Sequence, residues 1–119
     1  MKKIFLLIFI SLFILGCNSN EKANSQFISS EEVTKIMNEK EYVIIDVRTK
    51  EEYDEKHLEN AINIPYDEIN SNIDISKDKT IFVYCKSGNR SNTAWNTLNN
   101  LGYTVYDLGA FESIDLTIE

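Results

Sequence analysis

Four short stretches of the chain are rich in large apolar side chains and predict β-strands. Residues 42–45 and 80–84 form nearly continuous apolar runs, which is typical of strands covered on both faces of a sheet. Shorter runs over 61–64 and 103–108 also favour strands. Pro65 ends the first of these because proline cannot donate a hydrogen bond to the ladder of a sheet. The pattern therefore predicts a sheet with two well-buried strands.

Helices are predicted between the strands by capping residues and by apolar spacing. Ser29 and Thr49 each precede a glutamate by three residues, which is the capping-box pattern that opens a helix. A longer amphipathic helix is expected from Ser91 to Gly102, and one or two helical turns are expected over 66–72. Because strands that alternate with helices pair in parallel, the chain is expected to form one layered α/β domain. Its site is expected beyond the carboxyl ends of the strands.

The beginning of the chain has the pattern of an export signal. Two lysines follow the initial Met, and residues 4–15 are then apolar except for Ser11. This run is shorter than the roughly 20 apolar residues that cross a bilayer. Its end at 14–17, Ile-Leu-Gly-Cys, resembles the lipobox of bacterial lipoproteins. In that motif the chain is cleaved before the cysteine, and the cysteine sulfur carries a diacylglyceryl group.

This resemblance divides the chain into three parts. Residues 1–16 are expected to be a lipoprotein signal peptide, 17–26 a polar tether anchored through lipidated Cys17, and 27–119 the folded domain. The domain would then lie at the outer face of the bacterial cell membrane. The alternative is a plain signal peptide with an incidental cysteine. If Cys17 is acylated, Cys85 has no internal disulfide partner, so it is either an intermolecular pairing partner or a reactive thiol.

Composition excludes several classes of function. The 119 residues carry 19 acidic and 12 basic side chains, a net charge of −7, so nucleic acid is not expected as a partner. Two cysteines and one histidine are too few for a closed zinc site, so no metal is expected. The chain also has no glycine-rich fingerprint of the nucleotide-binding kinds.

The segment that follows the strand at 80–84 carries the candidate chemistry. It passes from a buried strand to a helix within a few residues, and Gly88 with Asn89 can adopt the positive φ that so tight a loop needs. Inward-facing N–H groups would then form an anion-binding nest beside the N-terminus of the next helix. Cys85 lies at its base, where the nest and two cations would favour the thiolate, so we expect it to be the nucleophile. The candidate binding residues around it are Lys86, Ser87, Gly88, Asn89, Arg90 and Ser91. The alternative is a buried, inert cysteine.

Three motifs, one of them in two parts, resemble the rhodanese-like family, and the resemblance covers about 27–109. Cys85-x-x-Gly88-x-Arg90-Ser91 resembles the active loop of its single-domain sulfurtransferases. The segments that resemble its upstream signature and closing strand are Asp46-Val47-Arg48 with Glu52-Tyr53, His57-Leu58-x-x-Ala61-x-Asn63-Ile64-Pro65, and Leu101-Gly102-Tyr103-x-Val105-x-x-Leu108-Gly109. Lys56 and Asn60 stand where the family usually has glycine. After Gly109 the family commonly has a second glycine and then a tryptophan, whereas this chain continues with Ala110 and no tryptophan.

The resemblance implies a single rhodanese-like domain with a mainly parallel central sheet and helices on both faces. It also implies sulfur transfer. The Cys85 thiolate would take the sulfane sulfur of a donor such as thiosulfate or a polysulfide, and the resulting persulfide would pass it to cyanide, a thiol or a protein acceptor. Lys86 and Arg90 would attract an anionic donor. No cofactor is implied.

Two other functions stay open for this fold. Phosphatases and arsenate reductases use a loop in which five residues separate the cysteine from the arginine, whereas four separate Cys85 from Arg90. The shorter cradle suits one sulfur better than a tetrahedral phosphate. The domain could also be a sulfur carrier or a binding module without turnover.

Several other residues are interpreted as structural. His57, the only histidine, is expected to make a structural hydrogen bond rather than to act as a base. Trp95 is expected to pack in the core. Arg48 and Glu52 are spaced so that they can pair across a helix start. Asp46 ends its strand near the expected site, where it and Arg48 are candidates for a supporting role.

Overall fold

The computed structural model describes residues 26–114, so the predicted signal peptide, Cys17 and nearly all of the tether lie outside the described residues. The strands are β1 (Tyr42–Asp46), β2 (Ala61–Asn63), β3 (Thr80–Cys85) and β4 (Thr104–Ala110). The helices are α2 (Ser30–Glu39), α3 (Lys50–Glu55), η2 (Tyr66–Glu68), α4 (Asn89–Asn100) and η3 (Phe111–Ser113). None of the helices within 26–114 has the length and apolar character needed to cross a bilayer.

The four strands form one parallel sheet in the order β2-β1-β3-β4. The two strands with the strongest apolar runs, β1 and β3, occupy its centre, and every residue of β3 is buried. Burial on both faces explains why these strands read as continuous apolar runs rather than as alternating patterns. The predicted parallel α/β arrangement is confirmed.

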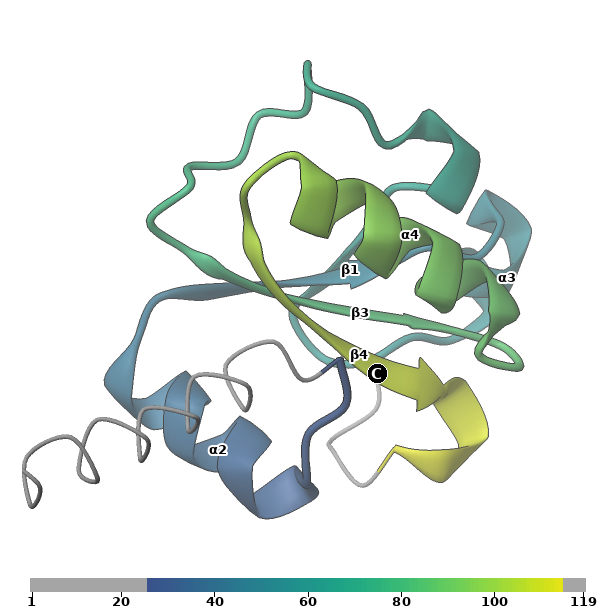
Figure 1. The fold of residues 1–119 in the computed structure, drawn as a ribbon. Helices are drawn as coiled ribbons and strands as arrows, with labels where there is room; N and C mark the ends of the chain where they lie inside the picture. The colour runs from purple at the N-terminus through teal and green to yellow at the C-terminus, as the bar shows by residue number, and fades with distance from the viewer. Residues whose placement is uncertain (1–25, 115–119) are drawn as a thin grey trace, which may run out of the picture.

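Helices cover both faces of this sheet, as expected (Figure 1). On one face α4 packs Ala94 and Leu98 against β3 and β4. The indole N–H of Trp95, also on α4, donates to the carbonyl of Val105 at 2.9 Å, which agrees with the predicted packing role. On the opposite face α2 and η3 contribute Val33 and Phe111 to a second apolar cluster. The sheet is thus the middle layer of three.

The helix starts follow the predicted caps. The hydroxyl of Thr49 accepts the N–H of Glu52 at 3.2 Å, and the Glu52 carboxylate accepts the N–H of Thr49 at 2.9 Å, so this capping box is complete. At Ser29 the hydroxyl accepts the N–H of Glu32 at 3.2 Å and donates to the Glu32 carboxylate at 3.4 Å. Both residues therefore cap their helices. Of these two caps, only Thr49 also donates its backbone N–H to the glutamate carboxylate.

The structure differs from the predicted boundaries at three places. Helix α4 begins at Asn89 rather than Ser91, so the positive φ of the preceding loop falls on Gly88 alone, at 101°. The helical turns expected over 66–72 are a single short 3-10 segment, η2. Strand β4 continues to Ala110 through a bulge that lies opposite the step from Val83 to Tyr84 of β3.

Candidate active site

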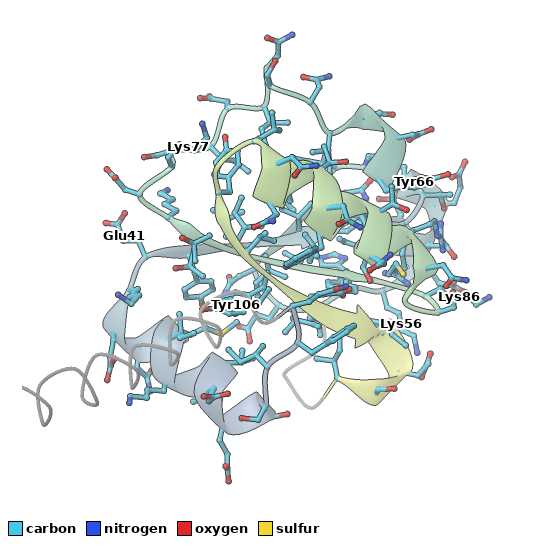
Figure 2. The ribbon with its side chains drawn as sticks, in the orientation of Figure 1. Glu41, Lys56, Tyr66, Lys77, Lys86 and Tyr106 are labelled. Atoms are coloured by element: carbon cyan, nitrogen blue, oxygen red, sulfur yellow. The ribbon has the colours of Figure 1, made fainter. Side chains whose placement is uncertain are left out.

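A three-residue loop joins the buried end of β3 to the start of α4. Cys85 is the last residue of β3, and Gly88, with φ of 101°, is the N-cap of α4. A side chain at this φ would cost about 1–2 kcal/mol, because the Cβ of an L-residue crowds the backbone there. Figure 2 shows Lys86 at the outer tip of this loop, pointing away from the domain. The predicted strand–loop–helix around Cys85 is therefore present.

Cys85 lies beneath this loop with no exposed surface (0%). Its Sγ accepts the N–H of Gly88 at 2.9 Å, and its side chain belongs to the apolar cluster that also includes Val83 and Ala94. A backbone N–H directed at sulfur stabilises negative charge there, which is the contact expected of the predicted nest. The full burial of the thiol is also what the alternative interpretation, a buried and inert cysteine, predicted. At this site a hydrogen bond therefore holds the sulfur in position, and the loop covers it completely.

The remaining loop residues divide into a buried support and an exposed rim. Ser91 is buried, and its hydroxyl donates to the carbonyl of Gly88 at 3.2 Å. The N–H of Asn92 donates to the same carbonyl at 3.1 Å. These bonds tie the turn at Gly88 to the first turn of α4. On the outer side Lys86, Ser87 and Asn89 are exposed to solvent.

Arg90 does not extend into open solvent but pairs with Glu52, 38 residues earlier in the chain. Its guanidinium donates two hydrogen bonds to the Glu52 carboxylate, at 3.0 and 3.3 Å. The Arg90 bonds, assisted by those from Thr49, outweigh the opposing effect of partial burial and lower the pKa of Glu52 to about 2. The expected pairing of Arg48 with Glu52 is wrong, because each residue has a better-placed partner elsewhere.

Arg48 instead forms a buried ion pair with Asp46. Its backbone N–H, Nε and Nη2 donate to the Asp46 carboxylate at 2.7–3.0 Å. Burial alone would lower the pKa of Arg48, but the hydrogen bonds and charge of Asp46 raise it. The Tyr84 hydroxyl also donates to this carboxylate, at 2.9 Å, and burial raises the pKa of Tyr84. Because neighbouring residues of a strand point to opposite faces, Tyr84 and its Asp46 partner lie on the face opposite Cys85.

Phe111 completes this network from the C-terminal segment. The Arg48 guanidinium lies 4.5 Å from the centre of the Phe111 ring, which stacks on the Tyr84 ring at 5.5 Å. The Lys56 ammonium approaches the same ring at 5.6 Å. Phe111 stands two residues after Gly109, at the position where the resembled family commonly has a tryptophan. This aromatic substitute was not predicted from the sequence, although its position in the motif could have indicated it.

His57 is held by Tyr53, four residues earlier in the chain. Its Nδ1 donates to the carbonyl of Tyr53 at 2.8 Å, and its ring stacks on Tyr53 at 3.8 Å. This arrangement agrees with the predicted structural hydrogen bond. Within residues 26–114 no three potential metal-ligating side chains of histidine, cysteine, aspartate or glutamate come together.

The comparison with a family model decides the relationship that the loop suggested. The model described as Rhodanese-like domain matches residues 29–114. The chain belongs to the rhodanese-like family. Its match begins one residue before α2 and ends one residue after η3, so it includes the whole sheet and both helical layers.

Similar proteins include both short and long chains. The thiosulfate sulfurtransferase PspE of Escherichia coli K12 is 39% identical over 74 residues, which are 59% of this chain and 71% of that protein. A probable molybdopterin-synthase adenylyltransferase of Porphyra purpurea is 40% identical over 68 residues, which are 54% of this chain but only 18% of the relative. A solved structure described as rhodanese with anions from E. coli is 32% identical, with a TM-score of 0.59 over 66% of this chain and 96% of that one.

Proposed function

We propose that this domain is a sulfurtransferase that carries sulfur as a persulfide on Cys85. The observation that carries the proposal is the hydrogen bond from the Gly88 N–H to the Cys85 Sγ at the carboxyl end of a parallel strand. Membership of the rhodanese-like family and similarity to a protein named thiosulfate sulfurtransferase support it. The Gly88 N–H can stabilise a sulfur anion, and this negative charge persists through both halves of a sulfur transfer.

The proposed reaction has two steps. The Cys85 thiolate attacks the outer sulfur of a donor such as thiosulfate. A Cys85–sulfur bond forms, the sulfur–sulfur bond of thiosulfate breaks, and sulfite leaves with the electron pair. An acceptor such as cyanide or a thiolate then attacks the terminal sulfur, so that the electron pair of the persulfide bond returns to Cys85 as the thiolate. The balance needs no oxidant, reductant or cofactor.

Lys86 has the role of attracting an anionic donor in this proposal. It is exposed at the tip of the loop in a chain whose net charge of −7 would otherwise repel anions. Ser91 has a supporting role, because its hydroxyl holds the Gly88 carbonyl and with it the orientation of the Gly88 N–H. The proposal thus assigns the reaction to Cys85, attraction of the donor to Lys86 and the shape of the loop to Gly88 and Ser91.

The direct test is intact mass after incubation with thiosulfate. The wild-type domain should gain one sulfur atom, and a reducing thiol should remove it. Cys85→Ser should gain none. A folded wild-type protein that gains no sulfur from thiosulfate or polysulfide would contradict the proposal.

Turnover separates an enzyme from a sulfur carrier. If the domain is a transferase, thiosulfate and cyanide together should yield thiocyanate over many cycles. One equivalent of persulfide without continued thiocyanate release would favour a carrier. Hydrolysis of an aryl phosphate that is lost in Cys85→Ser would favour the phosphatase alternative instead.

We also propose that Cys17 carries a lipid that anchors the domain at the outer face of the bacterial cell membrane. The supporting feature is the lipobox-like segment 14–17 after an apolar run of signal-peptide length. Metabolic labelling with palmitate should mark the wild-type protein and not Cys17→Ser. Equal labelling of the two, or none of the wild type, would contradict this proposal.

A further inference from the structure

The closed loop poses a question of access to Cys85. The thiol has no exposed surface, yet any reaction at Cys85 needs a reagent atom in contact with Sγ. The loop must therefore move away from the sulfur before chemistry can begin. The contacts that hold the loop shut decide how often this happens.

Most described contacts of the loop are local. The Gly88 N–H bonds to Cys85, and the Ser91 hydroxyl bonds to Gly88, so both bonds can move together with the loop. The Arg90–Glu52 pair differs because it connects the first turn of α4 to α3, which lies beside that end of α4 in Figure 1. Opening of the loop away from α3 would stretch this pair first.

The Glu52 carboxylate is held ready for Arg90 by its own helix. Its Oε1 accepts the N–H of Thr49 at 2.9 Å and lies 3.1 Å from the Thr49 hydroxyl. Both charged side chains of the pair are 27% exposed, and the guanidinium meets the carboxylate through two nitrogens. A fixed carboxylate and a two-nitrogen contact reduce the entropy lost when the pair forms.

We propose that the Glu52–Arg90 ion pair is a latch that holds the active loop closed over Cys85, with Glu52 as its positioning residue. An oxyanion such as thiosulfate offers paired oxygens like those of a carboxylate, so it can take the Arg90 guanidinium from Glu52 and open the loop as it arrives. The identity of this donor rests on the proposed function. The latch itself concerns only the accessibility of the thiol.

Alkylation of Cys85 measures the latch without any sulfur chemistry. Wild type, Glu52→Gln and Arg90→Met would be treated with iodoacetamide, a neutral reagent, and followed by intact mass. Glutamine can keep the capping box of α3, and Arg90→Met leaves Glu52 and Thr49 untouched. Removing a partly exposed ion pair should raise the alkylation rate about two- to fivefold in both variants. Asp54→Asn is the matched control, because it removes an exposed ion pair with Lys50 on the same helix and should leave the rate unchanged.

A charged reagent tests the role of the released guanidinium. In Glu52→Gln, the alkylation rate with iodoacetate should rise more than the rate with iodoacetamide, because Arg90 is then free to attract the anion. In Arg90→Met, iodoacetate should gain no more than iodoacetamide. A purely structural effect of the substitutions would change both reagents equally.

Three results would overturn the latch. One is an unchanged iodoacetamide rate in both variants. Another is acceleration in Glu52→Gln but not in Arg90→Met, which would assign the effect to the cap of α3. The third is equal acceleration in Asp54→Asn. If the variants accelerate as expected but thiosulfate never transfers sulfur to Cys85, the latch stands and the proposed sulfurtransferase function fails.

Discussion

Two loops at the same edge of the sheet are built alike but satisfy their polar groups differently. Three residues lead from Asp46 at the end of β1 to α3, and three lead from Cys85 at the end of β3 to α4. In the first loop the terminal carboxylate receives both the backbone and the side chain of Arg48. In the second loop the terminal thiol accepts one hydrogen bond within residues 26–114, from the N–H of Gly88.

The helices that follow the two loops differ in the same way, in how their first turns are capped. A complete capping box of Thr49 and Glu52 closes the start of α3. No side chain caps the start of α4, whose N-cap is Gly88. The first loop is therefore a closed structural unit, whereas the second leaves the backbone as the main partner of its sulfur. The comparison indicates that a loop whose polar groups have all their hydrogen-bond partners within the loop supports the fold. A loop whose polar groups have fewer such partners is suited to chemistry.

Cys85→Ser should give the largest contrast between the loops. Sulfur loading and thiocyanate formation should fall below about one-thousandth of wild type, because the nucleophile is removed. The thermal unfolding midpoint should fall only moderately, because serine is close to cysteine in size and can accept the Gly88 N–H, although its hydroxyl enters an apolar cluster. Intact mass and calorimetry measure the two effects. A variant that still loads sulfur would move the chemistry away from this loop.

Arg48→Met should affect the first loop mainly through stability. It leaves the Asp46 carboxylate buried without its cation, which should cost about 3–5 kcal/mol in the free energy of unfolding. Urea unfolding measures this loss. If the single variant fails to fold, the double variant Asp46→Asn/Arg48→Met should recover stability, since both charges are then removed. Lys50→Met, at an exposed ion pair in the following helix, should unfold near the wild-type midpoint.

Gly88→Ala should affect both stability and chemistry. The new Cβ would meet no atom within 4 Å, so the expected loss of about 1–2 kcal/mol comes from the positive φ alone. The strained loop should also hold its N–H less well on Cys85 and load sulfur more slowly. Gly102→Ala is the control, because Gly102 has a similar φ of 97° and equally open space. It should lose similar stability but load sulfur normally. Equal loading rates in both variants would deny Gly88 its special role.

The Glu52–Arg90 pair should give the smallest effect, and this effect should depend on pH. The pKa of Glu52 falls from 4.5 to about 2 in the folded protein, so its stabilising contribution is present above pH 4.5 and is lost as pH falls through about 2. At neutral pH the free energy of unfolding of wild type should exceed that of Glu52→Gln by about 1 kcal/mol or less. The difference should shrink between pH 4.5 and 2 in urea titrations. A difference that stays constant over this range would contradict the ion pair.

Local patterns were sufficient where one element satisfies its own groups. The apolar runs at 42–45 and 80–84 predicted β1 and β3, and Thr49 predicted the start of α3. Asn60, which stands where the family usually has glycine, has a φ of 70°, a left-handed backbone that asparagine tolerates better than most residues. These features depend on neighbours within a few residues, so spacing alone reveals them.

Ion-pair partners were harder to predict. Spacing favoured Arg48 with Glu52, but the structure pairs Arg48 with Asp46 two residues away and Glu52 with Arg90 38 residues away. The first choice depends on the sharp turn after β1. The second depends on how α3 and α4 lie against each other, for which the sequence carries no local signal.

The sequence by itself determined the order of strands and helices, the family and the tight loop that begins at Cys85. These follow from apolar runs, caps and short motifs, which act over a few residues. Only the tertiary structure decided that Asp46 and Cys85 lie on opposite faces, that Phe111 covers Arg48, and that Glu52 pairs with Arg90. The physical reason is that charge pairing and burial depend on distances in space, and packing of the helices on the sheet sets those distances.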